Sequence, residues 1–90
     1  MYENILPLEK VDNHENPKIT YHFTNPEKGY EWWICAGEKL GDDDYYFFGV
    51  GKIIDKEMGF MTLKQIIKYG GVLDEDWNED MGLQDVMMLR

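Results

Sequence analysis

Two segments of this chain alternate side chains with a period of two, a third is rich in aromatic and β-branched residues, and runs of turn-forming residues separate the three. The segments are residues 19–24 (ITYHFT), 30–37 (YEWWICAG) and 45–54 (YYFFGVGKII). A period of two is typical of β-strands, because successive side chains point to opposite faces of a sheet. Short connections join antiparallel neighbours. The pattern therefore predicts a small antiparallel sheet, to which residues 58–61 (MGFM) add a short fourth strand.

One helix is expected after the last of these strands. Thr62 can cap a helix that runs from Leu63 to about Tyr69, and the glycine pair that follows Tyr69 ends it. Residues 82–90 carry a helical stripe that is long enough for only one short C-terminal helix. The expected fold class is α+β, with an antiparallel sheet of three or four strands and one helix packed on one face. All of it belongs to a single domain, residues 1–90.

The apolar content predicts a folded chain despite its high charge. Hydrophobic residues make up 43% of the sequence and aromatic residues 14%, at a net charge of −9. The apolar runs are shorter than the ~20 residues of a membrane span, and the N-terminus lacks the basic start of a signal peptide. Cys35 has no second cysteine to pair with, which fits a reducing compartment. We expect a cytoplasmic protein without a membrane partner.

Missing residue types exclude several function classes. The chain has no serine, so it is not a serine hydrolase. Its only arginine is Arg90, and 18 carboxylates outweigh eight lysines, so we expect no direct binding to nucleic acid. His14 and His22 lack the spacing of a zinc site, and both are expected at the surface or the rim of the core. We predict no cofactor, no metal and no catalytic residue.

Two other functions remain as alternatives. The first is a small enzyme that uses Cys35 or paired carboxylates, and Cys35 with His22 on a neighbouring strand is its only conceivable nucleophile pair. The second is a calcium-responsive acidic domain at residues 74–85, where four oxygen-bearing side chains fall at positions 1, 3, 5 and 7 of a calcium loop. Glu79 replaces the turn glycine of such a loop, and Asp85 replaces its bidentate glutamate.

Four motifs carry a family resemblance: HFTNP at 22–26, YEWWIC at 30–35, FFGVG at 47–51 and EMGFMTL at 57–63. They resemble an uncharacterised bacterial family, the domain-of-unknown-function family twenty-nine fifty-eight, which occurs mainly on plasmids, phages and other mobile elements. The chain departs from the family pattern at Asn25, and at Ala36 where an acidic residue is usual. The resemblance implies a mobile-element accessory protein and lends no activity.

Two surfaces are expected to bind partners. One helix covers only one sheet face, so a ring-bearing face should stay exposed, and we assign Trp33, Tyr46 and Phe48 to it as a surface for a partner or for self-association. The other surface lies between Tyr69 and Leu89, where carboxylates occur without any lysine or arginine. Its candidate binding residues are Asp74, Glu75, Asp76, Trp77, Glu79 and Asp80.

The leading hypothesis joins these features. We expect a non-enzymatic acidic protein-interaction module that docks on a basic protein. In its most concrete form, the protein is a phage- or plasmid-encoded inhibitor that occupies the basic nucleic-acid-binding surface of a host defence enzyme. In that anti-defence role it would compete with DNA by charge.

Overall fold

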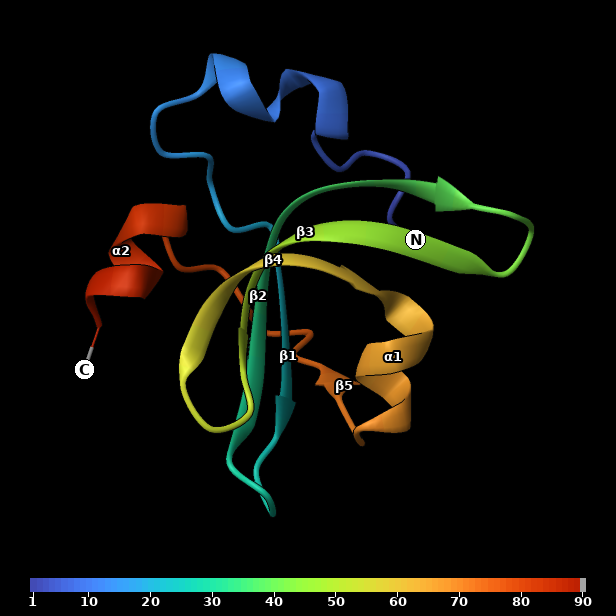
Figure 1. The fold of residues 1–90 in the computed structure, drawn as a ribbon, viewed down its shortest axis with the longest axis vertical. Coiled ribbons are helices and arrows are strands. Elements are labelled where there is room, and N and C mark those ends of the chain that lie inside the picture. The colour runs from blue at the N-terminus through green and yellow to red at the C-terminus, as the bar shows by residue number, and fades with distance from the viewer. Residues whose placement is uncertain (90) are drawn as a thin grey trace.

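The computed structural model describes residues 1–89, and five antiparallel strands form its single sheet in the order β4-β3-β2-β1-β5 (Figure 1). The strands are β1 (Tyr21–Asn25), β2 (Tyr30–Leu40), β3 (Asp44–Lys52), β4 (Lys56–Thr62) and β5 (Val72–Leu73). The helical elements are the 3-10 helix η1 (Leu8–Asn13) and the α-helices α1 (Leu63–Lys68) and α2 (Leu83–Met88). The protein is thus an α+β protein made mostly of sheet.

The four strands predicted from the sequence are present, and the sheet contains a fifth. Residues Val72–Leu73 pair antiparallel with Phe23 and Thr24 of β1. The prediction of three or four strands is therefore too low, because two residues are too short to show a period of two. The predicted helix after Thr62 is confirmed, since the Thr62 hydroxyl accepts the Gln65 amide and the Gln65 side chain accepts the Thr62 amide. The short C-terminal helix is also present.

Glycines allow the long β2–β3 hairpin to form. Gly41 in its turn has a φ of 67°, a conformation that favours glycine. Further along, the register shifts between Ile34 and Ala36, and Gly49 faces this irregularity. A Cβ atom added to Gly49 would lie 2.0 Å from the Trp33 carbonyl oxygen. The strands can approach this closely only because no side chain stands there.

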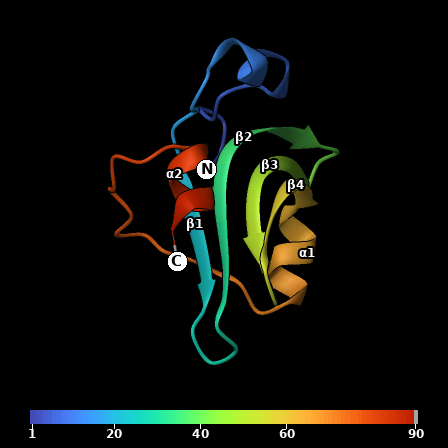
Figure 2. The same ribbon diagram turned by 60° about the vertical axis from the view of Figure 1, so that its left-hand side comes forward.

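Both faces of the sheet are covered, and the two α-helices lie on opposite sides of it (Figure 2). The first face, on the α1 side, carries the buried residues Tyr2, Ile5, Phe23, Trp32, Ile34, Phe47 and Ile66. The second face, on the α2 side, carries Ile19, Trp33, Cys35, Ala36, Val50, Leu83 and Val86. The prediction of one covering helix is not confirmed, because α2 and the chain before it bury the face that was expected to remain open.

The N-terminal residues complete the first core. The Tyr2 ring meets Tyr21, Tyr45 and Phe47 edge-on, at centroid distances of 4.8, 5.2 and 5.4 Å. Edge-to-face packing of this kind is favourable for aromatic rings. Nothing in the local sequence signals this docking, because residues 1–18 have no regular period.

No helix within residues 1–89 is long and apolar enough to cross a membrane.

Candidate functional site

The acidic segment, defined here as residues 74–82 (DEDWNEDMG), connects β5 to α2 without regular secondary structure. In Figure 2 it is the orange loop that runs beside β1 and up to α2. It starts at the β5 edge of the sheet, which is the edge opposite β4. The contacts of this segment decide whether its carboxylates are fixed or move with a loose loop.

Trp77 fastens the middle of the acidic segment to the second face. Its indole Nε1 donates a hydrogen bond to the Ile19 carbonyl oxygen at 3.2 Å, and its ring lies 4.7 Å from the His22 ring. The Ile19 amide in turn donates to the Met81 carbonyl oxygen at 2.9 Å. Trp77 was expected to contact a partner, but it is half-buried against the protein's own core. Its indole therefore holds the segment in place.

A buried histidine fastens the start of the segment. His22 Nδ1 lies 2.9 Å from Asp74 Oδ2, and His22 Nε2 lies 2.8 Å from Glu31 Oε2. Both ring nitrogens donate in a protonated imidazole, whereas a neutral one donates from only one of them. The ring also stacks on Trp33 at 5.6 Å. The expectation of a surface or rim position is wrong, because His22 is only 8% exposed.

Sequence reasoning missed this three-residue cluster. Glu31 lies diagonally across the β1–β2 hairpin from His22, because Thr24 pairs with Glu31 and His22 pairs with Trp33. A predicted hairpin register would have placed Glu31 within reach of His22. No local pattern could have supplied Asp74, which is 52 residues from His22 in the chain.

The Cys35–His22 pair of the enzyme alternative does not form. The buried Cys35 Sγ donates to the Phe48 carbonyl oxygen at 3.4 Å, while both His22 nitrogens face carboxylates. Burial raises the pKa of the Cys35 thiol to about 11. A thiol is a poor nucleophile until it loses its proton. Cys35 therefore acts here as a small core residue.

Two carboxylates in or next to the acidic segment have lowered pKa values: Asp74 at the start of the segment and Asp85 in the first turn of α2. The hydrogen bond to His22 lowers the pKa of Asp74, aided by the Asp76 amide. The Gly82 amide, with the Asn16 side chain, lowers the pKa of Asp85. In both cases the folded protein binds the proton less readily than the unfolded chain does. Their stabilisation is therefore fully present above the ordinary value of 3.8 and is lost as the pH falls below it.

We accordingly expect the variants Asp74→Asn and Asp85→Asn to lose less stability than the wild type on acidification. The free energy of unfolding, measured by urea titration from about pH 7 to about pH 3, should fall less steeply in each variant. Asp42→Asn, which removes an exposed turn carboxylate, is the control. Identical pH profiles for all four proteins would contradict the assigned role of the two carboxylates.

The remaining carboxylates of the segment face solvent. Glu75, Asp76, Glu79 and Asp80 are exposed, and the sequence from Tyr69 to Leu89 contains no lysine or arginine to neutralise them. Asp74 belongs instead to the His22 cluster. The predicted set therefore divides into four exposed carboxylates and two residues, Asp74 and Trp77, that hold the segment on the sheet.

The predicted aromatic surface is only partly correct. Trp33 is buried under α2 and the acidic segment, so the prediction that it is exposed is wrong. Tyr46 and Phe48 are half-buried. The exposed ring beside them is Phe60 on β4, which is 57% exposed, stacks on Tyr46 at 5.1 Å and contacts Phe48 at 5.0 Å. The sequence predicted that residues 58–61 form a strand, but it did not predict that this strand lies at the edge of the sheet.

The calcium alternative gains no support from the acidic segment. The residue at loop position 1, Asp74, has one oxygen facing His22 and the other accepting the Asp76 amide. Within residues 1–89, no three side chains of His, Cys, Asp or Glu gather in a way that could hold a metal ion.

Comparison of the chain with protein-family models, with curated proteins and with solved structures gives no match.

Proposed function

We propose that this protein is a non-enzymatic interaction module whose acidic segment docks on a basic surface of another protein. The observation that carries the proposal is the fixed conformation of the acidic segment. Trp77 and Asp74 hold it against the sheet, while four exposed carboxylates face outward. A cluster of carboxylates alone would be compatible with an inert solvated loop.

Fixing the segment favours binding in two ways. A loose loop loses conformational freedom when it docks, whereas a segment already held on a sheet loses little. Charges that keep their positions also present one pattern to an approaching partner, which speeds productive encounter. The Trp77 ring and the His22 cluster supply this rigidity without using any of the four outward carboxylates.

The partner that best fits this surface is a protein with a basic, nucleic-acid-binding face. The exposed carboxylates of the acidic segment offer such a face acceptor groups of the kind that DNA phosphates offer. The resemblance to a mobile-element family favours a host defence enzyme as the target. The protein would then act as an inhibitor that excludes DNA from that enzyme, with no need for a cofactor or a catalytic residue of its own.

Capture from a bacterial lysate, followed by elution with duplex DNA, tests this proposal. The tagged protein should retain a nucleic-acid-binding protein, and DNA should release that protein as its concentration rises. The variant that neutralises the four outward carboxylates should retain much less of it. Capture that DNA does not reverse, or that the neutralised variant preserves, would contradict docking through the acidic segment.

A further inference from the structure

The outer strand β4 has one open side. It pairs with β3 along its full length, from Lys56 opposite Lys52 to Thr62 opposite Tyr46. Within residues 1–89 no strand pairs with its other side, so Figure 2 shows it at the margin of the sheet. An open strand edge presents unpaired amides and carbonyls, and these can template pairing with another strand.

The usual protections of an edge strand are weak in β4. The strand contains no proline, and its central residues Met58 to Met61 carry no charge. Met58 is 47% exposed, and Phe60 is more so. The Lys56 ammonium is occupied elsewhere, because it donates to the carbonyl oxygens of Val86 and Leu89 at the end of α2. A hydrophobic edge of this kind normally meets a partner.

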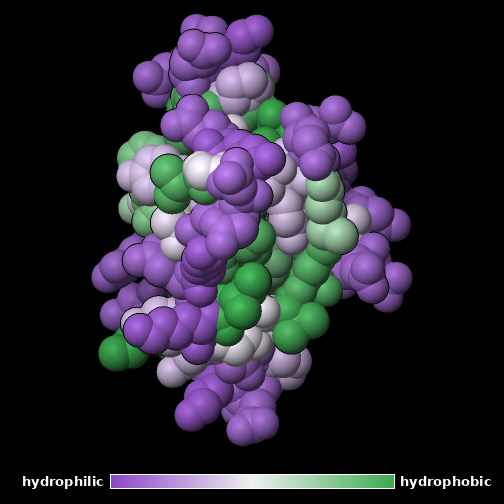
Figure 3. Space-filling view, turned by 90° about the vertical axis from the view of Figure 1, so that its right-hand side faces the viewer, coloured by the Kyte–Doolittle hydropathy of each residue, from purple (hydrophilic) through white to green (hydrophobic). Residues whose placement is uncertain are grey.

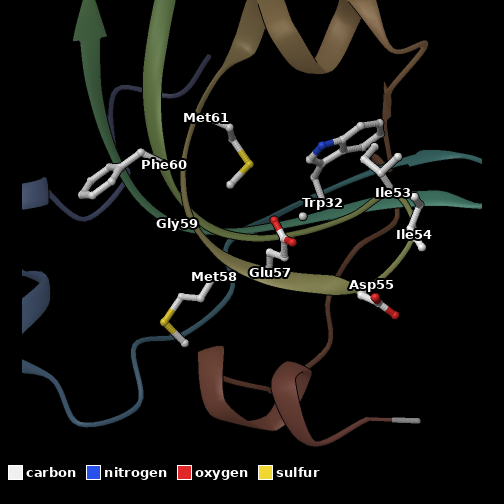
Figure 4. Close-up of a pocket in the computed structure, with 10 residues that line it drawn as sticks. Trp32, Ile53, Ile54, Asp55, Glu57, Met58, Gly59, Phe60 and Met61 are labelled. Atoms are coloured by element: carbon white, nitrogen blue, oxygen red, sulfur yellow. The ribbon is translucent and has the colours of Figure 1, made fainter.

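A shallow groove of about 410 Å³ adjoins this edge on the first face (Figure 4). Trp32 and Met61 stand on the α1 side of β4, whereas Met58 points to the opposite side. Two of its lining residues, Gly51 and Gly59, are glycines, so neither adds a side chain that would fill it. Figure 3, which views the α1 side, shows hydrophobic surface lying open between hydrophilic borders.

We propose that β4 pairs antiparallel with β4 of a second copy of this chain, about a two-fold axis at Gly59. This register places Met58 of each copy opposite Phe60 of the other, and all four side chains lie on one face of the joined sheet. Glu57 then faces Met61 of the second copy, so no like charges oppose each other. Gly59 faces its own equivalent, where an added Cβ would meet no atom within 4 Å.

The charge distribution favours a second copy as the occupant. The region of β3, β4 and α1, residues 42–68, contains five carboxylates and four lysines, a net charge of −1. The chain as a whole carries −9, so −8 resides elsewhere, including the acidic segment at the opposite sheet edge. Two β4 edges can therefore approach with little local repulsion. Pairing through one short strand makes a small interface, so the dimer is weak and depends on concentration.

Cysteine cross-linking tests the dimer and its register together. Residues directly opposite across an antiparallel pair have Cα atoms about 4.5–5.5 Å apart, within the range of a disulfide. Gly59→Cys should therefore form a disulfide-linked dimer under mild oxidation. Met58→Cys alone should not, because two residues at position 58 would be about 8 Å apart, but a mixture of Met58→Cys and Phe60→Cys should cross-link.

Wild-type protein is the control for these reactions, since its only cysteine, Cys35, is buried. Preferential linking of Met58→Cys with itself would overturn the register. Sedimentation of the unmodified wild type gives an independent measurement: the dimer fraction should rise with protein concentration and with added salt, which screens the overall negative charge.

Phe60→Lys should make the protein monomeric, whereas Ile67→Lys, at a similarly exposed position on the outer side of α1, should dimerise like the wild type. Thermal unfolding of both variants verifies that they remain folded. A wild-type chain that stays monomeric up to millimolar concentration would overturn the proposal. Equal loss of dimer in the two lysine variants would also overturn it, because the contact would then not be specific to β4.

Discussion

Replacing Trp77 with alanine is expected to lower the free energy of unfolding by about 2–3 kcal/mol and to free the acidic segment from the sheet. The estimate is below that for a fully buried tryptophan because Trp77 is half-buried. Two losses combine: the ring leaves its contact with His22, and the Ile19 carbonyl oxygen loses its donor. Urea unfolding measures the change in stability, and amide hydrogen exchange over residues 74–82 measures the release of the segment.

Two further variants test this estimate. One separates the hydrogen bond to Ile19 from the ring contact with His22, and the other is a control at an exposed ring. Trp77→Phe keeps a ring against His22 but cannot donate to Ile19, so it should lose about 1 kcal/mol. Tyr69→Ala removes an exposed ring and should change stability by less than about 0.5 kcal/mol. Unaltered hydrogen exchange in Trp77→Ala would show that the indole does not hold the segment. The interpretation of Trp77 as an inward anchor would then be wrong.

Neutralising the four outward carboxylates is expected to slow association with a captured basic partner by about 10- to 100-fold at low salt. The variant combines Glu75→Gln, Asp76→Asn, Glu79→Gln and Asp80→Asn. Its association rate should also depend less on salt, because fewer charges steer the encounter. Asp74 is left unchanged, since its bond to His22 makes it part of the fold. Stopped-flow or surface-based kinetics over a range of salt concentrations provide the measurement.

A control with the same net charge distinguishes the segment from the molecule as a whole. Glutamine or asparagine at the exposed positions Glu9, Asp12, Glu27 and Glu38 also removes four charges, which changes −9 to −5. This control should associate nearly as fast as the wild type. If both variants slow association equally, overall charge rather than the acidic segment attracts the partner. If neither does, the interface lies on another surface.

Local sequence determined most of the secondary structure, because its signals span only a few residues. The period of two marked β1 and β2, a stretch of aromatic and β-branched residues marked β3, and Thr62 marked the start of α1. These signals depend on which faces successive side chains occupy and on hydrogen bonds between residues three apart. The distribution of charge is equally local, since the stretch from Tyr69 to Leu89 holds carboxylates and no lysine or arginine.

Tertiary structure alone decided which faces and edges remain open. A period of two says which residues share a face, but it does not say what covers that face. Trp33 is buried because α2 and the acidic segment pack over it. Phe60 is exposed because β4 is an edge strand of the sheet.

The contacts that fix the acidic segment link residues far apart in the chain, His22 with Asp74 and Ile19 with Trp77. Separations of 52 and 58 residues leave no periodic or local trace in the sequence. Only the folded backbone brings the two ends of each contact together. The sequence thus determined that carboxylates gather near the C-terminus, and the tertiary structure decided that four of them are held in place facing outward.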